Sequence, residues 1–246
     1  MITHDNVKVE AEKRIEWIKE VLVQSGAKGI IFGSSGGKDS AVVGALVKKA
    51  TPHVLAVILP CGNIDKDEEH AWVLGKELNI ETIKVDIKEP FDVLSQTINQ
   101  VMTGTPLEGL SLSNIKPRLR MTTLYAIAQQ KGYLVAGTGN RSESTMGYFT
   151  KWGDGAHDFN PIADLTVTEV RILGDYLGVP HDILYKAPSA GLWVGQTDEE
   201  EMGVTYQEID EYLLTGDTNE RAKGIISEHY KKTKHKRQMP LKYQEK

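Results

Sequence analysis

Short apolar runs alternate with amphipathic stretches over the first half of the chain. Runs of strand length occupy residues 29–32, 54–59, 82–85 and 133–136. Apolar residues instead recur at helical spacing over residues 7–22, 91–101 and 114–130, and two further segments of helical length start near Asp39 and Asp67. Strands that alternate with helices are typical of a parallel sheet covered on both faces. The pattern therefore predicts an α/β fold, with a doubly wound, open parallel sheet and helices on both faces.

The second half of the chain carries two helix-start signals and one long segment without periodicity. Thr166 with Glu169, and Thr205 with Glu208, have the spacing of a capping box, which predicts that a helix starts at each. Residues 148–161 show almost no periodicity. We predict a loop there, and loops of that length inside a compact domain often form functional lids.

Composition and charge narrow the class of protein. The 246 residues are 40% hydrophobic and 26% charged, as in ordinary globular proteins, and we expect residues 1–246 to form one domain. Lys and Arg number 29 against 34 Asp and Glu, so the net charge of −5 gives no general attraction to nucleic acid or to an anionic membrane. With no signal-peptide pattern and no apolar run near about 20 residues, we expect a cytoplasmic protein without a membrane span. The lone Cys61 is expected to be a structural thiol.

A glycine-rich turn joins the first apolar run to the next helix. Residues 33–40 read Gly-Ser-Ser-Gly-Gly-Lys-Asp-Ser. In such a turn the glycines permit positive φ and expose consecutive N–H groups, and the helix start adds partial positive charge. It is not a Walker loop, because Phe32 and Asp39 stand where that pattern needs Gly and Ser or Thr. We predict a phosphate site of another type, with a tight structural connection as the alternative.

Asp39 lies directly beside this predicted phosphate site. A carboxylate in that place repels a bound anion unless a cation lies between them, so Asp39 suggests a Mg²⁺ ligand. The alternative is that Asp39 only caps its helix. A second glycine-containing turn, residues 137–142, does not match a dinucleotide-binding fingerprint because its sixth position is Ser142.

Several longer motifs, in their order along the chain, resemble a broad enzyme family and one narrower family within it. Residues 35–40, Ser-Gly-Gly-Lys-Asp-Ser, are similar to the S-G-G-x-D-S loop of the N-type ATP pyrophosphatases. Together with residues 137–143, 147–155, 188–193, 195–199 and 235–237, they resemble the ammonia-dependent NAD⁺ synthetases over roughly residues 15–240. The resemblance implies an adenine nucleotide alpha-hydrolase-like fold and a homodimer. The helices expected at residues 114–130 and 205–214 are candidates for the dimer contact.

The resemblance implies a ligase that completes NAD⁺ biosynthesis. ATP would adenylate the carboxylate of nicotinic acid adenine dinucleotide (deamido-NAD⁺), pyrophosphate would leave, and ammonia would displace AMP. Free ammonia is the expected nitrogen donor, unless a separate subunit delivers it, since the motifs fill the chain and leave no room for an amidase domain. The residues implied to bind ATP are Ser34, Ser35, Gly36, Gly37, Lys38, Asp39, Ser40, Thr138 and Ser189. Asp39 and Ser40 are expected to be catalytic, and Asp39 with Glu143 to bind Mg²⁺.

The resemblance also implies a set of contacts to deamido-NAD⁺. These residues are Asn114, Arg118, Phe149, Lys151, Asp154, Asp158, His235 and Lys236, whereas Arg120 is expected to serve structure. Without the resemblance, Glu143 would be an exposed helix-start carboxylate and Asp154 a turn residue. The basic run at residues 231–237 would be a solvated face.

Val167 departs from the family pattern. It stands where the family normally has a lysine that neutralises an ATP phosphate. One charge-assisted hydrogen bond is worth roughly 1.5–3 kcal/mol, so its loss is expected to weaken ATP use unless Lys38 compensates. On this interpretation Val167→Lys raises kcat/KM for ATP.

Two other interpretations stay open on the sequence alone. The same pyrophosphatase loop serves GMP synthesis, argininosuccinate synthesis and tRNA thiolation. GMP synthetases usually have added domains and thiolation enzymes usually have paired cysteines, and both features are missing from this sequence. Alternatively, the chain is a binder of NAD precursors or ATP that has lost turnover, with Val167 as the lesion. The presence of both Asp39 and Glu143 argues against a pure binder, which has less need for two metal ligands.

Overall fold

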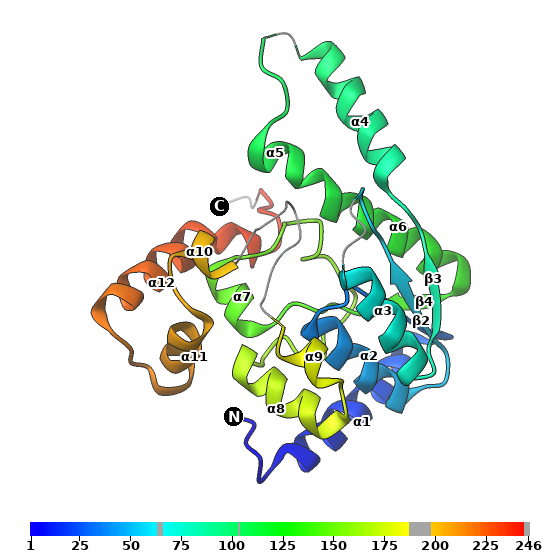
Figure 1. Cartoon of the computed structure of the whole chain (residues 1–246), viewed down its shortest axis with the longest axis vertical. Helices are drawn as coiled ribbons and strands as arrows, with labels where there is room; N and C mark the ends of the chain where they lie inside the picture. The colour runs from blue at the N-terminus through cyan, green and yellow to red at the C-terminus, as the bar shows by residue number, and fades with distance from the viewer. Residues whose placement is uncertain (63–65, 103, 187–197, 244–246) are drawn as a thin grey trace.

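Four parallel strands form the sheet in a computed structural model, which describes residues 1–62, 66–102, 104–186 and 198–243. The strands are β1 (Gly29–Gly33), β2 (Val54–Ile58), β3 (Glu81–Lys84) and β4 (Tyr133–Val135), in the order β3-β2-β1-β4 (Figure 1). Side chains alternate across the sheet, so Ile30 and Phe32 enter one core cluster and Ile31 enters another. Burial on both faces explains why β1 and β2 are continuous apolar runs, whereas the edge strand β3 is more polar and partly exposed.

Helices cover both faces of this sheet, as the alternation of elements predicts. The face of Ile30 and Phe32 packs against α1 (Val7–Ser25), α2 (Lys38–Ala50), α3 (Lys66–Glu77) and α8 (Val167–Leu177), with α9 (His181–Leu184) beside α2. The face of Ile31 packs against α6 (Ile115–Lys131), and α4 (Lys88–Val101) packs on α6. The predicted doubly wound parallel sheet is confirmed.

The direction of winding reverses between β1 and β4. The chain runs outward from β1 through β2 to β3, then returns through α4, α5 (Gly109–Ser113) and α6 to β4 on the other side of β1. In open α/β sheets, ligands bind at the carboxyl ends of the two neighbouring strands between which the direction of winding reverses. The residues that follow β1 and β4 therefore face the place where a ligand is expected.

A smaller helical lobe follows the second of these strand ends. It consists of α7 (Arg141–Met146), α10 (Asp198–Met202), α11 (Tyr206–Thr215), α12 (Glu220–Lys232) and the short 3₁₀ helix η1 (Lys234–Lys236). Its core holds Met146, Val167 and Tyr206 among other buried side chains. The lobe lies to one side of the sheet (Figure 1).

Most of the elements expected from the sequence are present. The four strands match the four apolar runs, and the two capping boxes start α8 and α11 as predicted. Residues 148–161 contain no helix, and their one strand-like contact is a bridge between Phe159 and Ala136. Helices α5, α7, α10 and α12 were not predicted from the sequence. In the described part of the chain, no helix has the length and apolar content needed to cross a bilayer.

Candidate active site

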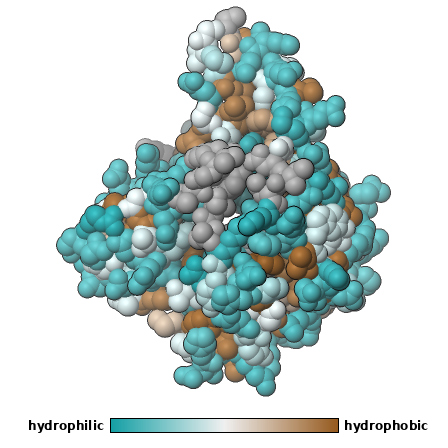
Figure 2. Space-filling model, viewed as in Figure 1, coloured by the Kyte–Doolittle hydropathy of each residue, from teal (hydrophilic) through white to brown (hydrophobic). Residues whose placement is uncertain are grey.

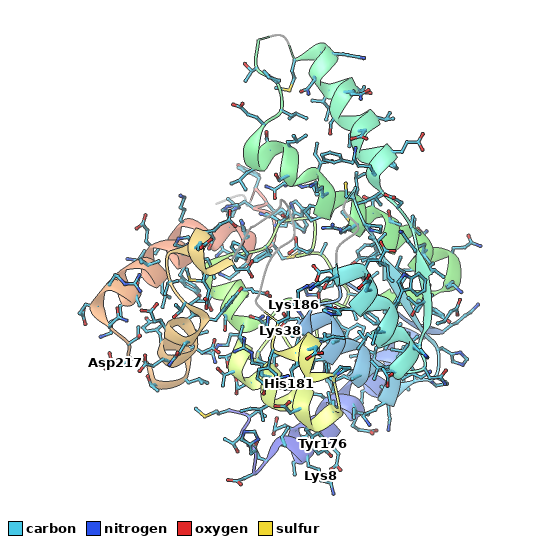
Figure 3. The ribbon with its side chains drawn as sticks, in the orientation of Figure 1. Lys8, Lys38, Tyr176, His181, Lys186 and Asp217 are labelled. Atoms are coloured by element: carbon cyan, nitrogen blue, oxygen red, sulfur yellow. The ribbon has the colours of Figure 1, made fainter. Side chains whose placement is uncertain are left out.

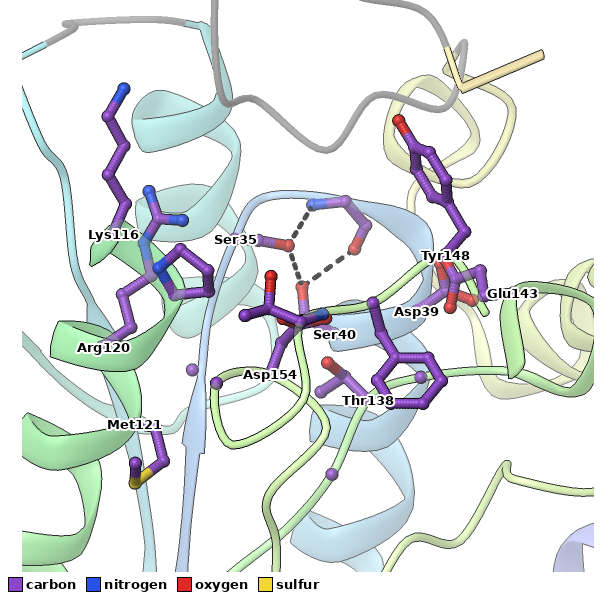
Figure 4. Close-up of a pocket in the computed structure, with 18 of the residues that line it drawn as sticks. Ser35, Asp39, Ser40, Lys116, Arg120, Met121, Thr138, Glu143, Tyr148 and Asp154 are labelled. Carbon is purple, nitrogen blue, oxygen red and sulfur yellow. Dashed lines mark hydrogen bonds between the residues drawn. The ribbon is translucent and has the colours of Figure 1, made fainter. Parts of the chain in front are cut away.

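A cavity of about 660 Å³ opens at the carboxyl ends of β1 and β4. Its lining brings together Ser34, Ser35, Gly37, Lys38, Asp39, Ser40, Asn114, Thr138, Glu143, Phe149, Asp154 and Lys236 from the predicted site (Figure 4). These residues come from the loop after β1, the start of α2, the loop after β4, α7, the segment after α7 and the C-terminal segment. Positions far apart in the sequence therefore share one cavity.

The loop after β1 forms a cradle of polar groups at the N-terminus of α2. Gly36 has φ +74°, and a Cβ there would lie 2.0 Å from the backbone oxygen of Asp67, so this position requires glycine. Ser35 Oγ accepts from the Gly37 N–H at 3.3 Å and lies 3.1 Å from Ser40 Oγ, which donates to the Gly37 carbonyl (Figure 4). No side chain caps α2, so its first N–H groups stay available to an anion.

Asp39 and Glu143 both line the cavity, lie next to each other (Figure 4) and are joined through Asn140. The buried Asn140 donates from Nδ2 to Asp39 Oδ1 at 3.1 Å, and its backbone N–H donates to Glu143 Oε2 at 2.9 Å. Asn140 Oδ1 in turn accepts from the Glu143 N–H at 2.9 Å, which completes a capping box at the start of α7. One asparagine thus fixes both carboxylates relative to each other.

Two carboxylates in this position repel each other. Burial, followed by the charge of Asp39, raises the pKa of Glu143 to about 8. Among the residues that the structure describes, no group of three or more His, Cys, Asp or Glu is placed to hold a metal. A carboxylate pair is nevertheless the donor set that Mg²⁺ uses when substrate phosphates supply further oxygens. Asp39 and Glu143 therefore fit a metal that arrives with a nucleotide.

Lys38 provides a positive charge at the same point. Its side chain is only 5% exposed, its Nζ lies 2.7 Å from Asp39 Oδ2, and the Tyr206 ring lies beneath it at 5.7 Å. Burial alone would lower the pKa of Lys38, but Asp39 and Glu143 outweigh it and raise that pKa. The lysine is therefore charged in this site. Figure 3 shows Lys38 near the centre of the molecule, in contrast to Lys8 and Asp217 at its edge.

The opposite wall is built by the segment that follows α7. Thr150 Oγ1 donates to Asn114 Oδ1 at 2.7 Å, and its backbone N–H donates to Asp154 Oδ1 at 2.9 Å. Lys236 Nζ donates to the carbonyls of Gly147 and Phe149, at 2.8 and 2.7 Å. The C-terminal segment is thereby tied to this wall, so Lys236 does not lie on a solvated face.

The two arginines of α6 occupy different surroundings. Arg120 lines the cavity and donates from Nε to the Leu59 carbonyl at 3.0 Å, and burial lowers its pKa. It forms no ion pair with any described residue. Arg118 is exposed, lies outside the cavity lining, and donates to the Lys151 carbonyl at 3.4 Å. Of these two arginines, Arg120 is therefore the one at the cavity, and the substrate role expected for Arg118 stays a prediction.

Some predicted site residues lie outside the cavity lining. Both oxygens of Asp158 are bonded, to the Tyr125 hydroxyl at 3.1 Å and to the Val135 N–H at 2.7 Å, so this side chain holds the edge of β4. Lys151 Nζ donates to the His235 carbonyl at 2.6 Å, which joins two expected substrate contacts to each other. Their substrate roles stay predictions. Ser189 lies outside the described residues.

Val167 is also outside the described lining of the cavity. It is 1% exposed and belongs to the apolar cluster that includes Met146 and Tyr206. Tyr206 is the residue whose ring lies under Lys38, and its hydroxyl donates to Asp198 Oδ2 at 2.9 Å. Val167 therefore contributes no charge to the cavity, and it is connected to Lys38 through the Tyr206 side chain.

Asn140, Arg120 and Tyr206 take part in the site, although the sequence analysis assigned none of them a role there. Asn140 carried a usable signal, since Asn140 and Glu143 have capping-box spacing in the sequence. Arg120 and Tyr206 carried none, because their positions depend on how α6 and α11 pack against the sheet and the lobe.

Comparison with known proteins decides the family. The sequence model described as NAD synthase matches residues 10–241. The chain is 48% identical to the NH₃-dependent NAD⁺ synthetase of Carboxydothermus hydrogenoformans over 236 residues, which cover 96% of this chain and 97% of that protein. The chain belongs to the NAD synthase family.

Solved structures agree with membership of the NAD synthase family. The NMN synthetase of Francisella tularensis superposes with a TM-score of 0.90 at 40% identity, covering 96% of this chain and 98% of that one. The NH₃-dependent NAD synthetase of Campylobacter jejuni superposes with a TM-score of 0.79 at 30% identity, covering 97% and 99% of the two chains. The resemblance to an enzyme family that the motifs suggested is therefore confirmed, together with the fold.

Proposed function

We propose that this chain catalyses the ATP-dependent amidation of deamido-NAD⁺ to NAD⁺ with ammonia, releasing AMP and pyrophosphate. The observation that carries the proposal is the cradle of residues 33–40, which shares one cavity with the pair Asp39–Glu143 and with a polar wall that includes Asn114 and Asp154. The curated relatives named NH₃-dependent NAD⁺ synthetases, which match over nearly their whole length, support it.

The first step forms a mixed anhydride. A carboxylate oxygen of the nicotinate attacks the α phosphorus of ATP, the bond to the bridging oxygen of the β phosphate breaks, and pyrophosphate leaves. The free N–H groups at the start of α2, with Ser35 and Ser40, lie where they can bind the departing pyrophosphate. Donors fixed in advance stabilise charge that grows during the displacement without having to reorganise.

Asp39 and Glu143 are the residues that would hold Mg²⁺. The bound metal would neutralise phosphate charge and orient the triphosphate for in-line displacement. Asn140 contributes by keeping the two carboxylates apart and aligned, because it bonds to both of them.

The second step exchanges AMP for ammonia. The nitrogen lone pair attacks the carbonyl carbon, a proton leaves the nitrogen, and the bond from carbon to the AMP oxygen breaks. Water competes with ammonia for this anhydride, so the wall from Phe149 to Asp154 has the further task of limiting water access. Lys236, which also lines the cavity, supports that wall through its bonds to the carbonyls of Gly147 and Phe149.

A coupled assay tests the proposed function. Deamido-NAD⁺, Mg-ATP and ammonium are mixed with the protein, and NAD⁺ and pyrophosphate are measured together, with Asp39→Ala as the blank. Equimolar products that disappear in the variant are expected. Pyrophosphate without NAD⁺ would show that the acceptor is wrong, and no product at all would favour the binder of nucleotides.

A second candidate substrate rests on one specific observation. The solved structure with the TM-score of 0.90 is named an NMN synthetase, whose name implies a mononucleotide product. The same cavity and chemistry would amidate nicotinate mononucleotide, which differs from deamido-NAD⁺ by the absence of its AMP half. Running the assay with each acceptor separately decides between them, because the true substrate should show the higher kcat/KM.

We also propose a homodimer that acts in the cytoplasm as one domain over residues 1–246. The arm of α4 and α5 projects from the rest of the chain (Figure 1) and gathers apolar side chains on its surface (Figure 2). Val93, Leu94, Val101, Met102 and Leu110 of this arm are all exposed. This exposure favours the arm and the adjoining α6 over α11 as the dimer contact. Light scattering should give twice the chain mass of 27.3 kDa, and Val93→Asp with Leu94→Asp should halve it.

A further inference from the structure

Lys38 and a metal ion compete for the same carboxylate. Both oxygens of Asp39 already hold a donor, since Oδ1 accepts from Asn140 and Oδ2 accepts from the Lys38 ammonium at 2.7 Å. Asn140 is buried and bound to Glu143 as well, so it is fixed in place. A metal that binds Asp39 Oδ2 in the position that the ammonium now occupies must displace the lysine.

The surroundings give the lysine another place to go. Lys38 is the first residue of α2, whose first N–H groups have no side-chain cap, and it lines the same cavity as Ser35 and Ser40. A lysine side chain has a flexible stem and three rotatable donors, so its ammonium can turn without movement of the backbone. A phosphate held in the cradle would lie within its range.

Electrostatics make the exchange favourable only when metal and phosphate arrive together. With Lys38 on Asp39, the group formed by Lys38, Asp39 and Glu143 has little net charge to attract a free cation. A phosphate chain supplies the negative charge that draws the lysine away, and the freed carboxylate then meets the cation. The Tyr206 ring, 5.7 Å from Nζ, faces the ammonium before it moves.

We propose that Lys38 is an exchangeable counter-ion: it neutralises Asp39 in the free protein and transfers to the triphosphate when a divalent metal and a nucleoside triphosphate enter together. The inference rests on the proposed function, since it takes Mg-ATP as the ligand. It gives the site its own positive charge for the phosphates, so the valine at position 167 leaves no deficit. Because Lys38 neutralises Asp39 in the free protein, a divalent metal without the nucleotide should bind weakly.

Replacement of Lys38 should change two affinities in opposite directions. In Lys38→Met nothing competes for Asp39 Oδ2, so Mn²⁺ alone should bind at least about threefold more tightly. The same variant lacks the charge-assisted bond to phosphate, so α,β-methylene-ATP with Mn²⁺ should bind at least about tenfold more weakly. Replacement of a residue that only supports the fold would not tighten the binding of Mn²⁺ while weakening the binding of the nucleotide.

Titration calorimetry on the full chain measures both affinities without turnover. Lys49→Met is the matched control, because it removes the same charge from the exposed far end of α2 and should change neither affinity. Lys38→Arg keeps the charge and should leave the affinity for Mn²⁺ alone near that of the wild type, which guards against misfolding of the Met variant.

Three outcomes would overturn the exchange. Unchanged Mn²⁺ affinity in Lys38→Met with weaker nucleotide binding would make Lys38 a simple phosphate ligand. Weaker binding of both would make it a structural residue. Failure of the wild type to bind α,β-methylene-ATP with Mn²⁺ would overturn the proposed function as well, which separates that failure from the first two.

Discussion

Two glutamates occupy the same local position in this molecule, but their surroundings shift their pKa values in opposite directions. Glu143 in α7 and Glu208 in α11 are each the third residue of a helix, and each accepts from the backbone N–H of its N-cap residue, Asn140 or Thr205. The pKa of Glu143 is raised to about 8 by burial and by Asp39, whereas hydrogen bonds from Thr205, Asn219 and Arg221 lower the pKa of Glu208 to about 2.

This difference in pKa distinguishes a glutamate of the candidate active site from one in the surrounding structure. Glu208 is surrounded by donors, so its charge stabilises the peripheral lobe in which it lies. Glu143 is placed beside a second carboxylate, so its ionisation costs stability even though Lys38 is paired with Asp39. Carboxylates held close together at a cost in stability are a sign of a binding site for a cation. The local sequence pattern is the same in both places, so only the tertiary neighbours make the difference.

Replacement of Asp39, the carboxylate next to Glu143, should lower the activity the most. Asp39→Asn takes away a proposed metal ligand and the partner of Lys38, so kcat/KM should fall by about two to three orders of magnitude. Asp217→Asn is the control, since Asp217 is also paired with a lysine, Lys223, at 2.6 Å, but lies at the edge of the molecule (Figure 3). Steady-state kinetics should show no change for that control, and equal losses in both variants would contradict the distinction between site and scaffold.

The cradle can be tested by a pair of glycine substitutions. Gly36→Ala introduces a methyl group that would lie 2.0 Å from the Asp67 backbone oxygen, in addition to strain from φ +74°, and should weaken ATP binding by at least about tenfold. Gly178→Ala has the same kind of strain, with φ +79°, but no atom within 4 Å of the new methyl. Calorimetry should find normal ATP affinity in Gly178→Ala. If both lose affinity alike, strain and not cradle geometry is the cause.

The arginines of α6 provide a milder test. Arg120→Lys removes the planar group that faces the cavity, and it should raise KM for the dinucleotide about tenfold. Arg118→Lys, on the exposed side of the helix, should change KM by less than about threefold. The reverse order would restore the sequence-based expectation that Arg118 contacts the substrate.

The two glutamates themselves should show only modest changes in the free energy of unfolding, measured with urea without metal. Glu208→Gln should lose about 1 kcal/mol at pH 7, because part of the charge is screened by water. A lowered pKa gives stability that is present above the ordinary value of about 4.5 and lost as the pH falls toward 2, so this loss should vanish near pH 2.

Glu143→Gln should behave in the opposite way. A raised pKa means that the folded protein holds its proton more tightly than the unfolded chain between about pH 4.5 and 8, so wild-type stability falls as the pH rises through that range. Glutamine does not ionise, so Glu143→Gln should gain stability relative to the wild type over the same range. A parallel pH profile for the two glutamine variants would contradict the comparison.

The fold was predictable from the sequence because it depends on patterns that are local. Runs such as residues 54–59 are apolar throughout since both faces of the sheet are covered, and capping boxes at Thr166 and Thr205 start helices where predicted. Helix α7 spans six residues, too few for a periodic pattern to show. The tight turn between β1 and α2 was predictable from its glycines, and its binding of phosphate stays a prediction.

The chemical environment of the site was less predictable. Lys38 and Lys236 look like solvated charges in the sequence, yet one is 5% exposed and the other is bonded to two carbonyls across the cavity wall. Most of the site residues that the resemblance to a family pointed to line the cavity, whereas the preference for Arg120 over Arg118 depends on the rotation of α6. That rotation is set by packing against β1 and β4 and leaves no mark in the local sequence.

The adenylation step can be followed through a single oxygen atom. Deamido-NAD⁺ labelled with ¹⁸O in its nicotinate carboxylate is converted with Mg-ATP and ammonium, and the AMP is analysed by mass spectrometry. Attack of that carboxylate on the α phosphorus leaves one of its oxygens on AMP, so each AMP formed together with NAD⁺ should carry one ¹⁸O. Unlabelled AMP would contradict the adenylation step and, with it, the roles proposed for the cradle and its carboxylates.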